Sequence, residues 1–346
     1  MSIGPNGELY NPTLQPSPDL NPQKDAETLY KAMKGLGCDE KKLIEVLGKR
    51  TYLQRKEIAI AFKNTYNKDL KSELVSETNG NFGKLVKHSL MSVAEQRALA
   101  CYHAISGAGT DEAVLIEVLG LATNSEIKEI KTAYQDVLRD KGKNPEKRSL
   151  EKDIKDDCGG LFGRVLLAIL AAKRDEPTAE MMQAIPKYGI ASIIDRRAAI
   201  KDAESLYDAG EGKLGTDETK FIKILVRRSV WQLAAIDAAY SELSNKTLEE
   251  AIKSEMSGDL ARILILLLKC SLDRPGQIAE MLYKSMAGLG TNDSSLMRLI
   301  LTRCEIDLAD IKKVYQTKYR RTLEEDIKGD TSGNYKKMLF ALCGSS

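Results

Sequence analysis

A short glycine-rich segment occurs four times along the chain, and this repetition restricts the fold more than any other feature of the sequence. The copies are MKGLGCDE at 33–40, ISGAGTDE at 105–112, KLGTDE at 213–218 and MAGLGTND at 286–293. Each copy is followed by a related apolar segment, at 43–50, 115–122, 221–228 and 296–303. A third set of related segments begins with an acidic residue, at Glu77, Asp157, Glu255 and Asp330. Four copies of one unit predict an array in which similar supersecondary units pack against one another.

Apolar residues within each unit have the spacing of α-helices. In the first unit one apolar stripe consists of Ala26, Leu29, Tyr30 and Met33. No segment shows the alternation that is typical of a strand. Gly35 is expected to form a left-handed C-terminal cap, and N-caps are expected at Cys38 and at its equivalents Thr110, Thr216 and Thr291. These patterns predict an all-α fold with about five short helices in each unit.

The spacing of the copies gives the expected domain boundaries. From Cys38 through its three equivalents the intervals are 72, 106 and 75 residues, so the second and third units are held further apart than the others. An insertion at 140–149 and a linker at 173–201 account for the excess, and the apolar residues of the linker are compatible with a helix of its own. The expected organisation is a mobile, proline-rich tail at 1–24, units at 25–92, 93–172, 202–272 and 273–346, and the linker between the second and third units.

Composition limits the classes of partner and the compartment. Lys and Arg number 52 and Asp and Glu 50, so the formal net charge is only +2 and no nucleic-acid partner is expected. The six cysteines include no CxxC pair, which is typical of free thiols in a reducing compartment. The first residues lack the order of a signal peptide, and the apolar run at 263–268 is too short to cross a bilayer. We therefore expect a cytoplasmic protein that contacts membranes peripherally, with export independent of a signal peptide left open.

An acidic residue follows each glycine-rich turn at a regular interval. The interval from Cys38 to Glu77 is 39 residues, and it is the same in the third and fourth units. In the second unit the interval from Thr110 to Asp157 is 47 residues, and the eight additional residues match the insertion. Glycine allows backbone carbonyl oxygens to converge on one point, and Ca²⁺ accepts about six to eight such oxygens together with carboxylates. The sequence therefore predicts half of a calcium site in each turn, which lipid phosphate oxygens would complete.

An apolar residue lies between the glycines at the tip of each turn, namely Leu36, Ala108, Leu214 and Leu289. Such a tip is expected to be exposed to solvent, where an apolar side chain needs an explanation. Shallow insertion into a bilayer interface is one explanation, to which each leucine would contribute about 1 to 2 kcal/mol. Packing on a neighbouring loop is the alternative.

Other kinds of site fit less well. The chain has no Walker loop and no GxGxxG after a strand, and neither GxSxG nor HExxH surrounds its two histidines, His88 and His103. No nucleophile and base are expected to converge, so we do not expect an enzyme. A helix cap would explain the first glycine of each turn, but not the second glycine or the acid.

The fourfold GxGTDE turn, the LIxVLxxR helix and the later acid before a glycine resemble the annexin family over residues 24–346. The resemblance implies a slightly curved, all-helical disc of four five-helix repeats, with calcium loops on its convex face and the tail on its concave side. It implies Ca²⁺-dependent binding to acidic, phosphatidylserine-like phospholipid membranes. The long linker resembles that of invertebrate annexins, including flatworm members. A protein partner or a second copy is expected at the tail or at the linker. The alternative function is a helical-repeat scaffold for protein partners, in which the loops are only structural.

The ligand pattern of the family can be carried over to the matching positions. In the first repeat it assigns the carbonyls of Met33, Gly35 and Gly37 with the carboxylate of Glu77. In the second it assigns Ile105, Gly107, Gly109 and Asp157. In the third, whose AGEGKLGT loop is longer, it assigns Gly210, Lys213, Gly215 and Glu255. In the fourth it assigns Met286, Gly288, Gly290 and Asp330, and weaker secondary positions use Glu40, Glu112 and Glu218. Cys38 departs from the family pattern, which has threonine there.

Overall fold

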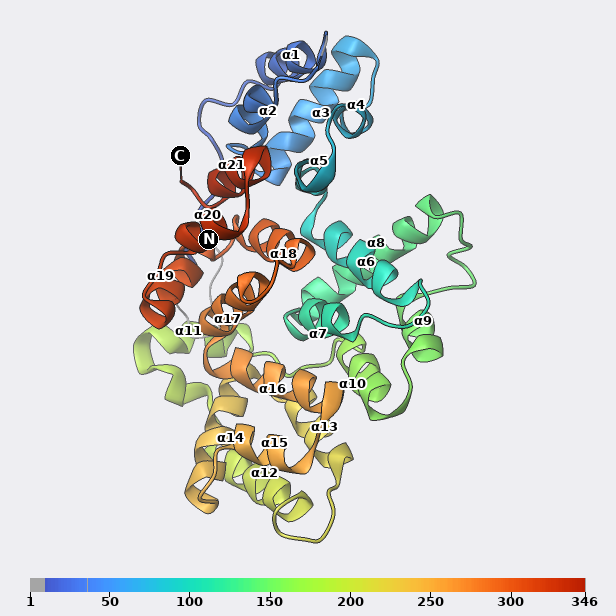
Figure 1. Cartoon of the computed structure of the whole chain (residues 1–346). Coiled ribbons are helices and arrows are strands. Elements are labelled where there is room, and N and C mark those ends of the chain that lie inside the picture. Colours follow the sequence, from blue (N-terminus) through green and yellow to red (C-terminus); the bar gives the residue numbers. More distant parts are fainter. Residues whose placement is uncertain (1–9, 36, 346) are drawn as a thin grey trace. The chain divides into compact units, whose positions relative to one another are not determined.

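The computed structural model describes residues 10–35 and 37–345, which form 21 α-helices, one 3₁₀ helix and no strand (Figure 1). Each repeat contains five helices, and two further helices lie between the second and third repeats. The prediction of an all-α fold with four five-helix repeats is confirmed. None of the described helices is long and apolar enough to cross a membrane.

The helices form two compact units, each of which contains two repeats. The I/IV unit covers Tyr10–Gln96 and Ile278–Ser346, and the II/III unit covers Arg97–Gln277. The first repeat consists of α1 (Pro22–Met33), α2 (Glu40–Leu47), α3 (Tyr52–Tyr66), α4 (Leu70–Glu77) and α5 (Gly80–Ser89), and the fourth of α17 (Arg274–Met286), α18 (Asp293–Arg303), α19 (Leu308–Tyr319), α20 (Leu323–Asp330) and α21 (Gly333–Leu342). The second repeat consists of α6 (Val93–Ile105), α7 (Glu112–Gly120), α8 (Asn124–Asp140), α9 (Leu150–Asp157) and α10 (Gly160–Leu170), and the third of α12 (Arg196–Ala209), α13 (Glu218–Arg227), α14 (Val230–Leu243), α15 (Leu248–Glu255) and α16 (Gly258–Leu272).

The two repeats of the I/IV unit stabilise their first and third helices with equivalent aromatic pairs. Tyr30 of α1 stacks on Tyr66 of α3, with 3.8 Å between the ring centroids. Tyr283 of α17 stacks in the same way on Tyr319 of α19, at 4.1 Å. Such a pair contributes about 0.5 to 1.5 kcal/mol beyond the area it buries. The first and fourth repeats therefore share this packing contact as well as their sequence pattern.

The described part of the N-terminal tail is bonded to the fourth repeat. The backbone N–H groups of Thr13 and Leu14 both donate to the carbonyl of Cys304, at 2.9 Å each. The Thr13 hydroxyl donates to the carbonyl of Leu342 at 2.7 Å, and the Asn11 amide donates to Asp310 at 2.8 Å. These bonds hold the beginning of the described chain against α18, α19 and α21.

The linker between the second and third repeats contains α11 (Ala179–Tyr188) and the 3₁₀ helix η1 (Ile190–Ile193). Its first residues are fixed by Arg174, whose backbone exchanges hydrogen bonds of 3.1 and 2.8 Å with the side chain of Asn124. The Arg174 guanidinium donates to the carbonyls of Arg228 and Leu225 at 3.2 and 3.3 Å. Arg174 and Ala122 line the same small pocket. Ala122 stands where the other repeats have arginine, so the linker brings a guanidinium to a repeat that lacks its own.

Candidate metal centres

Each glycine-rich turn connects the first two helices of its repeat and is closed by one backbone hydrogen bond. The N–H of Asp39 donates to the carbonyl of Ala32 in the last turn of α1, at 2.8 Å. The equivalent bonds are Asp111 to Ala104 at 2.9 Å, Asp217 to Ala209 at 2.7 Å and Asn292 to Ser285 at 2.7 Å. The bond spans seven residues in three repeats and eight in the third repeat. The sequence predicts a longer loop in the third repeat. Its loop is one residue longer than the others and is closed by the same backbone hydrogen bond.

The second helix of each repeat begins one residue later than the sequence pattern indicated. Its N-cap side chains accept a hydrogen bond from the backbone N–H of the third residue of the helix, and they belong to Asp39, Asp111, Asp217 and Asn292. The prediction of N-caps at Cys38 and the three threonines is therefore wrong. Asp and Asn cap at least as well as Thr, and here they take the N-cap position. The threonine hydroxyl is left free for another partner.

In the II/III unit that hydroxyl joins the turn to the distant acid. Thr110 Oγ1 donates to Asp157 Oδ2 at 2.6 Å, and Thr216 Oγ1 donates to Glu255 Oε2 at 2.6 Å. The first bond joins residues 47 apart and the second joins residues 39 apart. The insertion in the second repeat therefore leaves the acid beside its turn, as the intervals predicted.

In the I/IV unit the acid is also close to the turn, with different contacts. Thr291 Oγ1 donates to the main-chain carbonyl of Asp330 at 3.2 Å, and not to its carboxylate. In the first repeat the thiol of Cys38 takes the place of the hydroxyl. Burial, and then the negative charges of Glu40 and Glu77, raise the pKa of this thiol to about 11. The carboxylate of Glu77 therefore acts on the turn through its charge, without a hydroxyl to orient it.

None of the four acids forms an ion pair with Lys or Arg in the part of the chain that the structure describes. Glu77, Asp157 and Asp330 are exposed. Glu255 is half-buried, and its side chain lies so close to Gly210 that an added Cβ there would be 3.1 Å from Glu255 Cγ. Because no ion pair neutralises these carboxylates among the described residues, they are available to a cation.

Positive φ angles explain why the turns need glycine. They are found at Gly35 (130°), Gly37 (89°), Gly109 (88°), Gly215 (82°), Gly288 (110°) and Gly290 (89°). An added Cβ at any of these six positions would meet no atom within 4 Å, so backbone conformation and not space excludes other residues. The turns therefore present their carbonyl groups without side chains in the way.

The donor atoms at these turns suit a hard cation. Among the described residues no three His, Cys, Asp or Glu side chains gather in a way that could hold a metal ion. A metal would therefore take one carboxylate and several backbone carbonyls, a donor set that fits Ca²⁺ and not the sulfur and nitrogen ligands of zinc. The carbonyls carried over from the family pattern, at Met33, Gly35, Gly37, Ile105, Gly107, Gly109, Gly210, Lys213, Gly215, Met286, Gly288 and Gly290, all lie in these turns or in the helix ends beside them. In the third repeat the Gly210 carbonyl already accepts a hydrogen bond from the N–H of Lys213 at 3.1 Å.

The apolar tips of the turns are exposed. Leu214 and Leu289 have relative accessibilities of 105% and 109%, as large as in an extended peptide. Ala108 is exposed too, whereas Leu36 lies outside the described residues. Neither leucine packs on a neighbouring loop, which was the alternative explanation.

Two asparagines that the sequence interpretation missed link the first and fourth repeats. Asn81, at the start of α5, donates to Asp293 Oδ2 at the start of α18, at 2.6 Å. Asn334, at the start of α21, donates in the reciprocal way to Glu40 at the start of α2. The four residues line one pocket of about 360 Å³ within the I/IV unit, and Asp330 lines it as well.

A repeat alignment could have revealed this link. The positions equivalent to Asn81 and Asn334 hold Leu161 and Asp259 in the second and third repeats. The asparagines occur only in the pair of repeats that use them. Since Glu40 already accepts a hydrogen bond there, it is less available as a secondary ligand than the sequence suggested.

Comparison with known proteins gives a consistent result. The annexin family profile matches residues 24–88, 96–169, 201–267 and 277–342. The chain is 47% identical over 343 residues to annexin A13 of Schistosoma japonicum, covering 99% of this chain and 97% of that protein. It is 40% identical over 343 residues to annexin B22 of Schistosoma mansoni, covering 99% and 94%. The crystal structure of calcium-bound annexin (Sm)1 matches with a TM-score of 0.89 at 39% identity, covering 99% of this chain and 96% of that one.

Proposed function

The chain belongs to the annexin family, and we propose on that premise that it binds acidic phospholipid membranes when the calcium concentration rises. Binding to calcium and phospholipid is typical of annexins. The observation that carries the proposal for this chain is the hydrogen bond between a turn threonine and an acid without a cationic partner, as in Thr216 and Glu255. The protein would be cytoplasmic and peripheral to the membrane, with no enzymatic activity.

The turns supply the ligands and hold them in place. Backbone closure fixes the carbonyl groups, and the threonine hydroxyl orients the carboxylate in the second and third repeats. One carboxylate per turn gives a low formal charge, so each site alone is expected to be weak. Bound Ca²⁺ would add positive charge that attracts lipid phosphate. Metal and lipid should therefore raise each other's affinity by the same factor.

Exposed leucines add an apolar contribution to the same contact. Leu214 and Leu289 have no packing partner in the described chain, and each would contribute about 1 to 2 kcal/mol on entering the interface between headgroups and acyl chains. Ala108 would contribute less, and Leu36 occupies the matching position in the first turn. Specificity for acidic lipid then comes from charge, and part of the affinity comes from these tips.

We expect the first and fourth sites to face one surface of the I/IV unit, because residues beside both turns line one pocket. The pocket lined by Glu40, Asn81, Asp293 and Asn334 lies at the beginnings of the helices that follow the two turns and the two acids. Two weak sites that can contact one surface together bind it far more strongly than either alone. Avidity within this unit is therefore expected to produce a steep calcium dependence.

Co-sedimentation with vesicles tests the proposal. Vesicles of phosphatidylcholine and phosphatidylserine should remove the protein from solution with calcium and release it with EDTA, and vesicles of phosphatidylcholine alone should not. Glu77→Gln and Asp330→Asn should each raise the calcium concentration needed for half-maximal binding while leaving helix content unchanged. Binding that does not depend on calcium, or no binding at all, would favour the scaffold function instead.

A further inference from the structure

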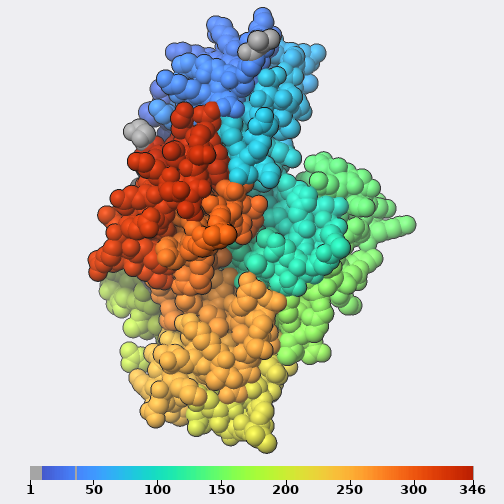
Figure 2. Space-filling model, viewed as in Figure 1, coloured from blue at the N-terminus to red at the C-terminus, as the bar shows by residue number. Residues whose placement is uncertain are grey.

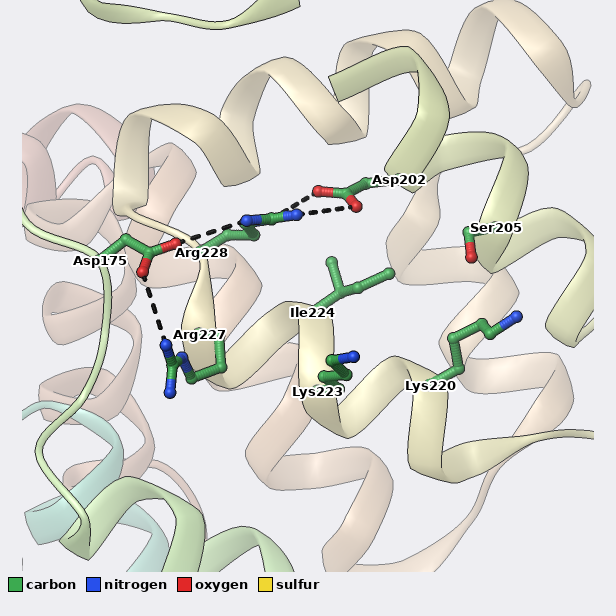
Figure 3. A pocket seen from close by; sticks show the side chains of 8 residues that line it. All are labelled: Asp175, Asp202, Ser205, Lys220, Lys223, Ile224, Arg227 and Arg228. Atoms are coloured by element: carbon green, nitrogen blue, oxygen red, sulfur yellow. Dashed lines mark hydrogen bonds and ion pairs between the residues drawn. The ribbon is translucent and has the colours of Figure 1, made fainter. Parts of the chain in front are cut away.

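A second charged feature lies in the third repeat, in a pocket of about 460 Å³ between α12 and α13. Lys220, Lys223, Ile224 and Arg227 line it from one side of α13, and Arg228 follows that helix (Figure 3). Asp202 and Ser205 of α12 face them, and Asp175 comes from the start of the linker. All of these residues belong to the II/III unit.

The acids of the pocket are already used by the arginines. Arg228 donates to both carboxylate oxygens of Asp202, at 2.6 and 3.1 Å. Asp175 lies 3.5 Å from Arg228 and 4.0 Å from Arg227 (Figure 3). Both acids of the pocket therefore form ion pairs with its two arginines, and neither lysine has a carboxylate partner there.

Both lysines of the pocket are without a partner. The described chain gives the side chains of Lys220 and Lys223 no hydrogen bond or ion pair, and the hydroxyl of Ser205 has none either. Lys220 is half-buried and Lys223 is exposed, while Ile224 forms an apolar floor between them. Residues 220, 223 and 227 are three and four positions apart on a helix, so their positive charges share one face.

The first repeat shows that this arrangement is not a general property of the fold. Lys42 occupies the position equivalent to Lys220, and it forms an ion pair of 2.7 Å with Glu45. Lys223 stands in the third repeat where Glu45 stands in the first. The change from acid to base removes the partner and adds a second cation. The third repeat therefore has two unpaired lysines at the positions where the first repeat has an ion pair without net charge.

We propose that this pocket binds a compact anion that carries more than one phosphate group, and that it does so without calcium. Two ammonium groups and the Arg227 guanidinium provide strong donors to phosphate oxygens, and Ser205 provides a neutral donor from the opposite helix. Several phosphates are required, because positive charges spread along one face of α13 match a ligand whose negative charges are spread as well. Both inositol phosphates and the headgroups of phosphoinositide lipids have this chemistry.

The α13 pocket and the calcium turns consist of different residues. Their charges also differ in sign before calcium binds. A calcium turn attracts phosphate only after a cation has bound, whereas the α13 pocket is already positive. Loss of calcium should therefore abolish binding to phosphatidylserine vesicles and leave the anion site intact. The two proposals can thus fail independently.

Calorimetry with inositol 1,4,5-trisphosphate in EDTA tests the site with the whole protein. We expect saturable binding at one site, weakened roughly tenfold or more by the double change Lys220→Gln and Lys223→Gln, since two charged hydrogen bonds are lost. The control is Lys41→Gln with Lys42→Gln, which removes the same charge from the equivalent helix of the first repeat and should leave the affinity unchanged. Raising the salt concentration should weaken binding to the unaltered protein.

A second arm identifies the source of the phosphates. Phosphatidylcholine vesicles containing phosphatidylinositol 4,5-bisphosphate are sedimented with the protein in EDTA. Retention that the pocket variant loses and the control variant keeps assigns the site to a lipid headgroup. Soluble binding without vesicle retention assigns it to a free inositol phosphate. Binding to neither probe, or equal binding by the two double variants, would overturn the proposal.

Discussion

Asn81 of the first repeat donates a 2.6 Å hydrogen bond to the carboxylate of Asp293 in the fourth repeat, across 212 positions of sequence. The acceptor is a charged carboxylate on the first residue of α18, where it also interacts favourably with the helix dipole. The bond therefore joins the start of α5 to the start of α18 and helps to hold the two repeats as one unit.

Replacing Asn81 by leucine, the residue at the equivalent position of the second repeat, should destabilise the protein by about 1 to 2 kcal/mol. The physical reason is loss of a hydrogen bond to a partly buried carboxylate, which then has fewer donors. Urea unfolding measures the change. Asn64→Ala, at an exposed position of α3, serves as control and should stay within about 0.5 kcal/mol. Equal stabilities of the two variants would show that the bond contributes nothing.

Cys38→Thr should strengthen the first calcium site. In the second and third repeats a threonine hydroxyl at this position bonds the acid at 2.6 Å, and in the first repeat Glu77 lacks that donor. A new hydroxyl would orient Glu77 and lower the calcium concentration for half-maximal vesicle binding, by about two- to fivefold for a gain on the order of 0.5 to 1 kcal/mol. The reverse change, Thr216→Val, should raise it. No shift in either variant would mean that the hydroxyl does not position the acid.

The turns, their acids and their exposed tips could be predicted from the sequence, because the segments that form them recur in all four repeats. The acids at 77, 157, 255 and 330 occur at intervals that survive an insertion, and such regularity requires a spatial role. The exposed tips follow from an apolar residue with glycine on both sides in three turns, and from Leu214 before Gly215 in the third repeat, since such a turn has no core to enter. These features depend on short segments and on comparison among the four copies.

The rest depends on which elements meet, and chain order does not reveal that. Asn81 finds Asp293 because the first repeat packs on the fourth, although the second repeat follows it in sequence. The N-cap was misplaced by one residue because threonine and aspartate both cap well, and only the backbone decides between them. The unpaired state of Lys223 likewise depends on Asp202 and Asp175 both being engaged by Arg228.

Leu289→Trp should report directly on membrane contact. The side chain is fully exposed and touches no other described residue, so the change should leave the unfolding free energy within about 0.5 kcal/mol. With acidic vesicles and calcium, the indole should enter the interface and its fluorescence should shift to shorter wavelength. The native Trp231 is 8% exposed and provides a constant background. An unchanged emission spectrum on calcium-dependent binding would remove Leu289 from the membrane contact.

Leu289→Ala tests the energy of the same contact. Loss of most of an apolar side chain should weaken vesicle binding by about 1 to 2 kcal/mol, which is roughly five- to thirtyfold. The buried Leu299 is unsuitable as a control because its truncation would damage the core, so Leu53→Ala is preferable, at a position that is 66% exposed and away from the turns. Equal weakening by both changes would indicate a general effect and not a specific tip.

Glu126 provides the clearest prediction about pH. Burial alone would raise the pKa of this carboxyl, but the attraction of Arg97 and Arg274 outweighs burial and lowers the pKa from 4.5 to about 2. Arg97 Nη1 lies 2.7 Å from Glu126 Oε1. Because the folded pKa is below the unfolded value, the stabilisation is complete above about pH 4.5 and is lost as the pH falls toward 2. A shift of this size corresponds to a stabilisation of roughly 3 kcal/mol.

Glu126→Gln should therefore cost stability at pH 7, where the native carboxylate is charged, and the difference should shrink as the pH approaches 3. Unfolding by urea at a series of pH values measures both proteins. Glu129→Gln, at an exposed position on the same helix, should show no such dependence. A destabilisation that stays constant from pH 7 to pH 3 would mean that the ion pairs of Glu126 are not the source of the difference, and that the substitution acts through packing or its capping bond to Thr123 instead.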